Sequence, residues 1–481
     1  MRELGGVVLG LALLAAAPRA GAAEVLSVGA YLGQVASNNQ GVAASRDLAR
    51  SADGAESEAS LFFRPQVFGT ANWGQDAQQV PLASFDRLDT QSFAFGLQQQ
   101  TDFGLQGKLY YGMNHIDLMG LDIPGLGSLG TIDAYDSGPT VQLSLSLWSN
   151  GLGRSARAQQ RQMLAGSRLQ RQGARLQDLA TQVQAENAYW RLAAAREAVG
   201  IQAQALAQAQ AILDNMNHKA QMKLGEPSDA LQAQGLVALR RLALKGAQSE
   251  ALSALKEFNS QRGKPCDTDP GDLEPLPYQE LLGFSPSAQK PGHRLDVAMA
   301  QSQAELAAAG AVVVEERNKP SLDIYGAYGL STLGGGYDSF ENGVIDGKRD
   351  AQVGLRFNAP LDVLSSYRVR EGARLNVKAQ QEQWEQKQTM EDKDWALLAQ
   401  QIRDAKESLE LAGQLVEAQQ AKLLDGRKRL EQGRAITNEV LMFEQDQSQA
   451  KLQRLQLAQQ LLSLRAALKL YSADDAAKAG E

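Results

Sequence analysis

The sequence has few of the residues that cross-link or interrupt a chain. It contains one cysteine, Cys266, in 481 residues, which excludes an internal disulfide. Its 14 prolines are few for this length, and long stretches of Ala, Gln and Leu predict elongated helices rather than a string of globular domains. Three histidines, His115, His218 and His293, lie far apart and lack metal-ligand spacing. We therefore expect neither a disulfide scaffold nor a metal site.

Motifs for catalysis and for nucleic-acid binding are also missing from the sequence. The formal net charge of −7 and the pI near 5.3 argue against a nucleic-acid partner, because phosphate binding needs a basic surface. Ser, His and Asp are scattered without motif spacing, and no glycine-rich phosphate loop follows a strand. We expect no enzyme, no catalytic residues and no cofactor.

Long apolar runs are confined to the N-terminus. Met1-Arg2, an apolar stretch over 4–17 and the small residues Ala20-Gly21-Ala22 predict a cleaved signal peptide, residues 1–22, and hence an exported protein. No cysteine stands at the cleavage site, which argues against a lipid anchor. Beyond the signal we find no run of about 18 apolar residues, and we expect no membrane-spanning helix. Strands remain as a means of crossing a membrane.

The chain contains an internal repeat. Residues 64–74, beginning Arg64-Pro65, are similar to residues 319–329, which begin Lys319-Pro320 and lie 255 positions later. In both copies a helical stretch runs into the proline, strands follow, and a long helix pair follows the strands. The predicted layout is a first repeat over 23–257 with four candidate strands, a linker over 258–292, a second repeat over 293–471 with two strands, and a flexible tail over 472–481.

Six stretches alternate apolar and polar residues with period two, which is the pattern of a strand with one apolar face and one polar, solvent-exposed face. The clearest is 141–147, where every odd position is apolar. The six candidate strands are 67–73, 93–97, 105–113, 141–147, 322–328 and 353–357. Segments 75–90, 114–139 and 331–349 are predicted to be long loops and 101–104 a short turn. Alternating short turns and long loops are typical of outer-membrane barrels.

The remaining segments have the heptad spacing of coiled coils. In the first copy apolar residues recur every seven positions at 192, 199, 206 and 213, and in the second at 402, 409, 416, 423 and 430. A helix over 155–222 would be roughly 100 Å long at about 1.5 Å per residue. A shorter helical segment over 25–62, broken near 37–39, precedes the first strands.

Each long helix is expected to end at a glycine, Gly225 or Gly433, and to fold back. The return helices are predicted over 229–261 and 438–470, with Ser228 or Thr437 as N-cap residues. Each copy therefore forms a long antiparallel helical hairpin.

Taken together, these features resemble the TolC-like outer-membrane efflux protein family over nearly all of the mature chain. The resemblance rests on the two helix-to-strand prolines Pro65 and Pro320, the stretch 293–297 that opens the second copy, the strand-to-helix passages at 147–151 and 359–363, and the glycine helix ends. Each feature alone is common, but here they occur in the same order twice.

The resemblance implies an α+β membrane protein: a trimeric outer-membrane β-barrel continued by a long α-helical coiled-coil periplasmic tunnel, built from two structural repeats. It implies a passive exit duct of a tripartite efflux pump or type I secretion system. The partners would be a periplasmic adaptor (membrane fusion protein), an inner-membrane pump of RND, ABC or MFS type, and outer-membrane lipid. The expected location is the outer membrane, with a periplasmic extension.

Alternation of the strands then assigns their two faces. The side chains expected to face lipid are Leu143, Leu145, Leu322, Ile324, Val353 and Leu355, and those expected to face the lumen include Gln142, Ser144, Asp323 and Arg356. Trp73, Tyr111 and Tyr328 are candidates for an aromatic girdle.

The chain departs from the family pattern in its first copy. Family members usually offer two strands per copy, but 83 residues separate Pro65 from Trp148 and only 41 separate Pro320 from Leu361. We predict an extra hairpin around 92–113, hence six strands per chain and eighteen in a trimer. An ordered extracellular or plug-like insertion, with twelve barrel strands, is the alternative. Leu295 also replaces the proline of the family's Arg-Pro-Asp motif.

The resemblance also points to a periplasmic gate. Counted from Gly433, Glu439 falls where the family carries a gate aspartate, and the second acidic position is Met442. Three such carboxylates around a pore would attract cations. The alternative is a solvated carboxylate in the first turn of a helix.

The hairpin ends are the expected docking surface for the adaptor. The residues are Leu224, Gly225, Ser228, Asp229, Gly433, Arg434 and Thr437. Arg434 could pair with Asp229 or Glu226 in place of the family's latch.

The competing functional hypothesis is an exported structural coiled-coil or adhesin-like protein whose strands form a soluble β-sandwich. Alternation alone does not separate the two hypotheses, because a sandwich also hides one face. Helix length, the paired hairpins and the aromatic positions favour the duct.

Overall fold

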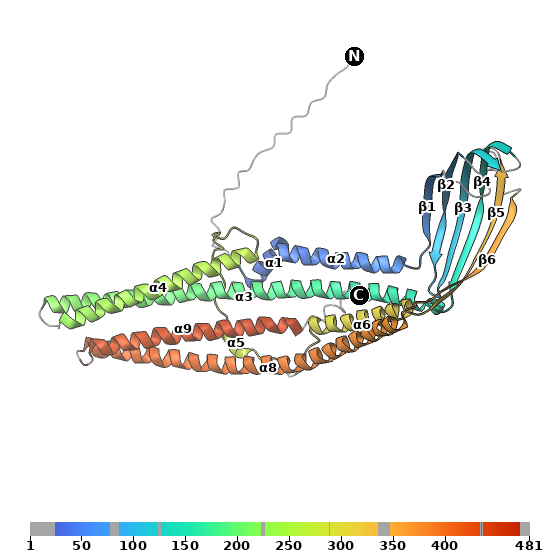
Figure 1. Cartoon of the computed structure of the whole chain (residues 1–481). Helices are drawn as coiled ribbons and strands as arrows, with labels where there is room; N and C mark the ends of the chain where they lie inside the picture. Colours follow the sequence, from blue (N-terminus) through green and yellow to red (C-terminus); the bar gives the residue numbers. More distant parts are fainter. Residues whose placement is uncertain are drawn as a thin grey trace, which may run out of the picture. The chain divides into compact units, whose positions relative to one another are not determined.

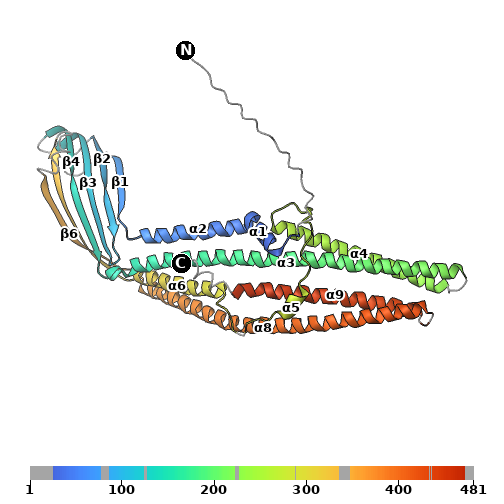
Figure 2. The same cartoon turned by 180° about the vertical axis from the view of Figure 1, so that it is seen from behind.

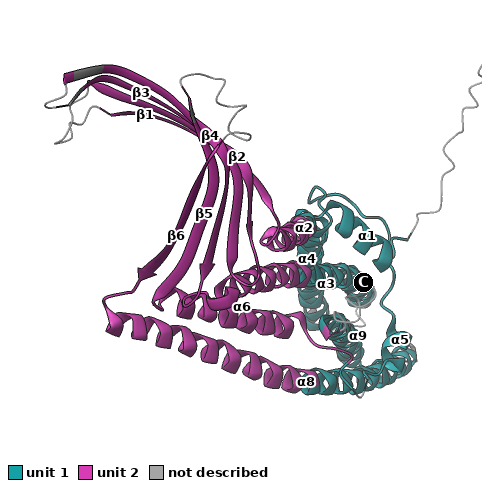
Figure 3. Cartoon of the chain, turned by 90° about the vertical axis from the view of Figure 1, so that its right-hand side faces the viewer, with its two compact units in different colours: residues 1–43, 178–290, 396–470 teal, residues 44–177, 291–395, 471–481 magenta. Residues whose placement is uncertain are grey.

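The computed structural model describes residues 25–76, 86–123, 127–222, 227–287, 289–334, 347–432, 434 and 436–471. The predicted signal peptide and the predicted tail over 472–481 therefore lie outside the described residues. The chain divides into two compact units (Figure 3). Unit 1 comprises residues 1–43, 178–290 and 396–470, and unit 2 comprises residues 44–177, 291–395 and 471–481. Each unit takes segments from both sequence repeats.

In the described residues of unit 2, one antiparallel sheet has the strand order β1-β2-β3-β4-β5-β6, and its six strands lie side by side in Figures 1 and 2. The strands are β1 (Gln66–Asp76), β2 (Arg87–Gln100), β3 (Leu105–Ile123), β4 (Gly127–Ser146), β5 (Ser321–Gly334) and β6 (Lys348–Asn358). All six predicted strands are confirmed. The extra hairpin is β2–β3, which pairs on both sides within the sheet and is not a separate insertion.

The long loop predicted over 114–139 is wrong. Strand β3 runs to Ile123 and β4 begins at Gly127, so most of this segment is a paired ladder. Its Asp, Asn and Ser residues include wet-face positions that pair across the strands, as Asn114 does with Asp136. On the opposite face His115 stacks on Tyr135 with ring centroids 4.2 Å apart. A composition typical of loops is compatible with a strand when polar residues fill a solvated face.

The helices of unit 2 pack along one another. They are most of α2 (Gln40–Leu61), the first part of α3 (Arg154–Gln221), α6 (Leu295–Arg317) and the first part of α8 (Val363–Glu431). Arg171 of α3 pairs with Asp53 of α2 at 2.7 Å, and the Ser302 hydroxyl of α6 donates to Gln172 at 2.9 Å. A short 3-10 turn, η1 (Gly151–Gly153), precedes α3.

One described helix, α6, is long and apolar enough to cross a membrane by length and composition. It contains no run of about 18 apolar residues, because Gln301, Gln303 and Glu305 interrupt it, and the expectation of no membrane-spanning helix stays a prediction. Alanine and valine give α6 its apolar character, and no uninterrupted apolar run is needed. Polar groups of α6 nevertheless bond to α3, including Ser302 and Glu305, whose carboxylate lies 3.5 Å from Arg168.

Unit 1 is built from helices around one aromatic centre. Its complete helices are α1 (Val28–Asn38), α4 (Pro227–Gln261), α5 (Tyr278–Gly283) and α9 (Thr437–Ala467). It also contains the remaining parts of α3 and α8 and all of the 3-10 turn η2 (Leu468–Tyr471) apart from Tyr471, which belongs to unit 2. Tyr31 stacks on Phe258 with ring centroids 4.2 Å apart, and Tyr189 completes the cluster. The heptad residues Leu192, Ile402 and Leu409 are buried, as coiled-coil packing requires.

The predicted break near 37–39 is confirmed. Helix α1 ends at Asn38, and the Asn39 side-chain oxygen accepts hydrogen bonds from the N–H groups of Gly41 (2.8 Å) and Val42 (3.2 Å). Asn39 thereby satisfies donors that the first turn of α2 leaves free.

The corner between β4 and α3, residues 147–153, contacts the turn between β2 and β3. Asn150, Leu152 and Gly153 all have positive φ, and a Cβ added to Gly153 would lie 1.9 Å from the Asp102 carbonyl oxygen. Arg157 of α3 donates to that same oxygen at 2.7 Å. The turn of the extra hairpin therefore rests on the backbone of the corner.

A buried carboxylate joins the end of α6 to the start of α3. The Glu316 side chain is 3% exposed, and it accepts a hydrogen bond from the N–H of Asn150 at 3.1 Å. Arg154 and Lys319 approach the same carboxylate at 3.5 and 2.8 Å. A buried carboxylate is stable only when donors of this kind surround it.

A second charged cluster lies where α6 begins. Arg294 pairs with Asp296 at 2.6 Å and with Asp394 of α8 at 2.9 Å, and Lys387 lies 3.5 Å from Asp296. Burial opposes ionisation of Asp296, but Arg294 and Lys387 outweigh it, so the pKa of Asp296 falls below its ordinary value of 3.8. Asp296 also stands in the first turn of α6, where a negative charge is favoured.

We expect Gly153→Ala to destabilise the protein by more than about 1 kcal/mol, because alanine is strained at positive φ and its methyl group would overlap the Asp102 carbonyl. Gly151→Ala is the matched control, since a Cβ there meets nothing within 4 Å. Thermal unfolding of the detergent-solubilised variants measures the difference. Equal midpoints for the two variants would contradict the proposed contact.

We expect Asp296→Asn to reduce stability by about 1–3 kcal/mol near neutral pH, the usual range for a charge-assisted hydrogen bond. Because the folded-state pKa of Asp296 is depressed, its contribution is present above pH 3.8 and is lost as the pH falls through the lower folded-state pKa. Unfolding curves of wild type and variant across this range should therefore converge in acid. A difference that grows on acidification would refute the assignment.

Candidate channel wall and helix ends

The register of the sheet gathers large apolar side chains on one face. Residues opposite one another in adjacent strands point to the same face, and one such row is Val67, Leu97, Leu109, Val141 and Tyr328. The six residues predicted to face lipid all lie on this face: Leu143, Leu145, Leu322, Ile324, Val353 and Leu355. Many of these side chains are solvent-exposed in the single chain, Val353 to 84%. Contiguous exposed apolar surface of this kind marks an interaction site.

Aromatic side chains lie on the same face. Trp73 of β1 contacts Phe93 of β2 edge to face at 5.4 Å, and Phe95 of β2 lies 6.1 Å from Tyr111 of β3. Trp73 and Tyr328 are exposed. All three residues predicted for an aromatic girdle therefore share the apolar face.

The opposite face carries polar side chains. The predicted lumen residues Gln142, Ser144, Asp323 and Arg356 lie on it by register. The amide of Gln142 donates to Tyr110 at 3.0 Å, and the Ser146 hydroxyl donates to Asp323 at 2.6 Å. In these rows of the sheet, one face is therefore apolar and the other is polar.

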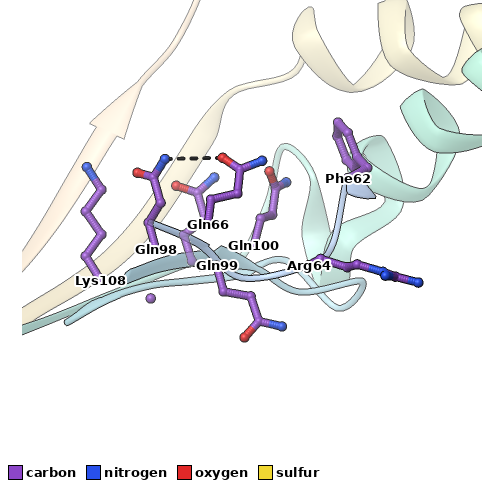
Figure 4. A pocket seen from close by; sticks show the side chains of 9 residues that line it. Phe62, Arg64, Gln66, Gln98, Gln99, Gln100 and Lys108 are labelled. Atoms are coloured by element: carbon purple, nitrogen blue, oxygen red, sulfur yellow. Dashed lines mark hydrogen bonds between the residues drawn. The ribbon is translucent and has the colours of Figure 1, made fainter. Parts of the chain in front are cut away.

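A hollow of about 290 Å³ lies at the base of this polar face. Figure 4 shows Gln66, Gln98 and Lys108 projecting from one side of the strands while Gln99 projects from the other. The amide of Gln98 lies 3.5 Å from the side-chain oxygen of Gln66. Glutamines and a lysine give this end of the sheet a polar lining.

The two edges of the sheet are open. In the described part of the chain, β1 pairs only with β2, and β6 pairs only with β5. Each edge strand is 11 residues long and presents backbone groups without a strand partner.

The ends of the helical hairpins meet within unit 1. The amide of Gln232 in α4 donates to the Asn438 side chain in α9 at 3.0 Å. Glu439 is exposed in the first turn of α9, and its N–H donates to the Ile436 carbonyl at 3.1 Å. The segment that contains the predicted gate therefore lies next to the other hairpin.

The predicted docking residues are only partly covered by the structure. Leu224, Gly225 and Gly433 lie outside the described residues. Asp229 and Arg434 are exposed, and no ion pair between these two is found in the described part of the chain. The predicted N-caps are wrong: α4 begins at Pro227 and α9 at Thr437, so Ser228 and Thr437 lie inside the first turns. Proline at the first helical position replaces the expected cap in α4.

Sequence reasoning missed a buried ion pair near these ends. Glu444 of α9, with a side chain 7% exposed, accepts a hydrogen bond from Arg427 of α8 at 2.6 Å. Arg240 of α4 is also buried; burial lowers its pKa, and the negative charge of Glu444 opposes that shift. Charges from three helices thus converge on one carboxylate. The three residues lie on different helices and far apart in the sequence, so the sequence does not indicate that they meet.

Comparison with known proteins identifies the fold. No family model and no curated protein matches the sequence. Among solved structures, the outer-membrane channel OprN is 17% identical with a TM-score of 0.66, over 93% of this chain and 89% of that one. The outer-membrane protein VceC from Vibrio cholerae is 14% identical with a TM-score of 0.65, over 92% and 96%.

A third neighbour, the CmeC outer-membrane channel of Campylobacter jejuni, is 13% identical with a TM-score of 0.65, over 93% of this chain and 85% of that one. In each case the likeness covers more than nine-tenths of this chain, and each neighbour is an outer-membrane protein or channel by its own description. The chain therefore has the fold of the TolC-like outer-membrane channels.

Proposed function

We propose that this protein is the outer-membrane exit duct of a tripartite efflux pump or type I secretion system. It acts as a homotrimer in the outer membrane, with its helices extending into the periplasm. The observation that carries the proposal is the six-stranded sheet with one apolar face, one polar face and two open edges, in a chain with the fold of known outer-membrane channels.

Open edges argue for a shared barrel. In lipid, unpaired backbone N–H and C=O groups are prohibitively costly, so strands that span a membrane must close on themselves. Six strands from each of three chains give a barrel of eighteen. With strands about 4.8 Å apart and tilted by about 35°, such a barrel would be roughly 34 Å across between opposite backbones, wide enough for an aqueous channel. The apolar face then meets lipid and the polar face lines the lumen.

A soluble β-sandwich is the weaker explanation. A sandwich needs a second sheet to cover the apolar face of the first. The described strands form one sheet, and Val353 and Leu355 on its apolar face are exposed. The same side chains are suited to contact with lipid.

The duct would be passive and depend on partners. We infer that a periplasmic adaptor and an inner-membrane pump of RND, ABC or MFS type supply energy and open the helical end. The likeness to channels such as MtrE of Neisseria gonorrhoeae, solved in an open state, supports an opening of this kind.

We further propose that Glu439 forms a carboxylate ring at the periplasmic gate and that the hairpin ends around Asp229 and Arg434 receive the adaptor. Glu439 is exposed in the first turn of α9, next to the contact between Gln232 and Asn438. Three such carboxylates near a threefold axis would concentrate cations. Asp229 and Arg434, both exposed, offer charges of each sign to a partner.

We expect the full-length protein to fractionate with the outer membrane, to resist carbonate extraction and to purify in detergent as a trimer. Reconstituted into planar bilayers, it should form ion-conducting pores, because its polar face lines the bore. A soluble monomer without pore activity would rule out the duct and favour the sandwich.

Two variants with two readouts test the helix ends. Glu439→Ala should reduce cation selectivity and block by multivalent cations a few-fold, because the charge of the ring is removed. Asp229→Lys with Arg434→Glu should weaken co-purification with the adaptor and leave cation selectivity unchanged.

Each variant serves as the control for the other. Wild-type selectivity and block in Glu439→Ala would make Glu439 an ordinary solvated carboxylate at a helix start. Undiminished adaptor recovery with the charge-reversed variant would place docking elsewhere.

A further inference from the structure

We propose that β6 of one copy pairs with β1 of the next in one defined register, with Gln66 opposite Asn358 and Asp76 opposite Lys348. This inference rests on the proposed function, because it describes how copies of the chain close a common sheet. It goes further by fixing which residues meet at the interface between subunits.

The two edges match in length and direction. In the described residues β1 (Gln66–Asp76) and β6 (Lys348–Asn358) each span 11 residues, so this register pairs every described residue of one strand with a residue of the other. Successive strands of the sheet are antiparallel. With six strands, β1 and β6 run in opposite directions, and β6 therefore meets the next β1 in the same antiparallel manner.

The two faces of the sheet allow β6 to shift along β1 of the next copy only by an even number of residues. Gln66, Phe68 and Thr70 lie on the polar face of β1, and Asn358 and Arg356 lie on the polar face of β6. A shift by one residue would place the apolar side chains of one strand beside the polar ones of the other. In the proposed register, Val67 is opposite Phe357 and Ala71 is opposite Val353 on the apolar face.

The tilt of the strands in a closed barrel decides which of these even shifts is the best one. The row of paired residues that starts at Gln66 in β1 ends at Gln352 in β6, by way of Gln98, Lys108, Gln142 and Ala327. Gln352 lies six residues before Asn358, the last residue of β6. The proposed pairing therefore shifts the register by six residues over six strands, or one residue per strand. A rise of about 3.3 Å for each 4.8 Å across corresponds to a tilt of about 35°, which lies in the range for membrane barrels. A shift of four residues would give only about 25° by the same spacing.

Repulsion between like charges argues against the next larger shift, of eight residues. A shift of eight residues would give a tilt of about 42°, which is also acceptable, but it would place Asp76 opposite Asp350. Like charges directly opposite one another destabilise a strand pair. The proposed shift of six places Asp76 opposite Lys348 and Gly74 opposite Asp350. Length, tilt and charge thus agree on one register.

Cysteine cross-linking of the full-length protein in outer membranes tests the register. In a Cys266→Ser background, Ala71→Cys is combined in turn with Val353→Cys, with Ala351→Cys for a shift of four, and with Leu355→Cys for a shift of eight. Opposed Cβ atoms lie about 4.5–5.5 Å apart and diagonal ones about 7–8 Å, whereas a disulfide needs about 3.5–4.5 Å. We expect oxidised dimers and trimers in about tenfold higher yield for the Val353 combination.

Asn72→Cys with Gln352→Cys tests the adjacent row on the polar face, with Asn72→Cys and Asp350→Cys as its shifted control. Neighbouring pairs alternate between close and wide spacing, so one of the two rows offers the closer geometry. Equal or stronger cross-linking of either shifted combination would overturn the register. So would cross-linking of Ala71→Cys or Asn72→Cys alone, which would indicate β1 against β1.

Charge reversal provides a second measurement that needs no cysteine. Asp76→Lys and Lys348→Asp should each lower the temperature at which the detergent-solubilised trimer dissociates, and the double exchange should restore it. Additive losses in the double variant would contradict the pair. Pore formation by wild type in bilayers is scored separately: pores with cross-links in another register reject this inference alone, whereas a soluble monomer rejects the proposed function as well.

Discussion

Backbone hydrogen bonding at the sheet edges is the constraint on which the rest of the molecule depends. Strands β1 and β6 expose backbone groups that have no strand partner in the described part of the chain. Water can satisfy such groups, but lipid cannot. The apolar face of the sheet, with Val353 and Leu355 exposed, is suited to lipid and poorly suited to water. A single copy cannot meet both conditions, and copies that share their edges can.

The proposed sharing of edges between copies requires a rigid join between the sheet and the helices, since each chain would have to present its edges at the same height. Two features of unit 2 supply that rigidity. Glu316, nearly inaccessible to solvent, ties the end of α6 to the Asn150 backbone and to Arg154. Gly153 allows the corner before α3 to contact the Asp102 carbonyl directly. Removing one partner from a buried charge is costly, so the Glu316 contacts favour a single geometry over a range of angles.

Much of the fold was predictable because period and repetition are local signals. Alternation located all six strands, and heptads located α3 and α8. The failures have different physical causes. Polar residues on the polar face of a strand, such as Asn114 and Asp136, have the same composition as a loop, so composition does not distinguish the two. Helix α4 starts at Pro227, two positions earlier than capping by Ser228 would suggest, and α9 starts at Thr437, one position earlier than capping by Thr437 would suggest. The contacts of Glu444 with Arg427 and its proximity to Arg240 depend on packing between helices, which a single sequence does not reveal.

The two sequence repeats have kept their helices alike and changed their strands. Helices α3 and α8 have 68 and 69 residues, yet among the described residues the first repeat contributes four strands and the second contributes two. The extra hairpin β2–β3 returns through the turn at Thr101 and Gly104. Its turn rests on the α3 corner, so the added strands take their position from an existing helix. In this chain the two added strands are therefore accommodated by a turn that fits the start of α3.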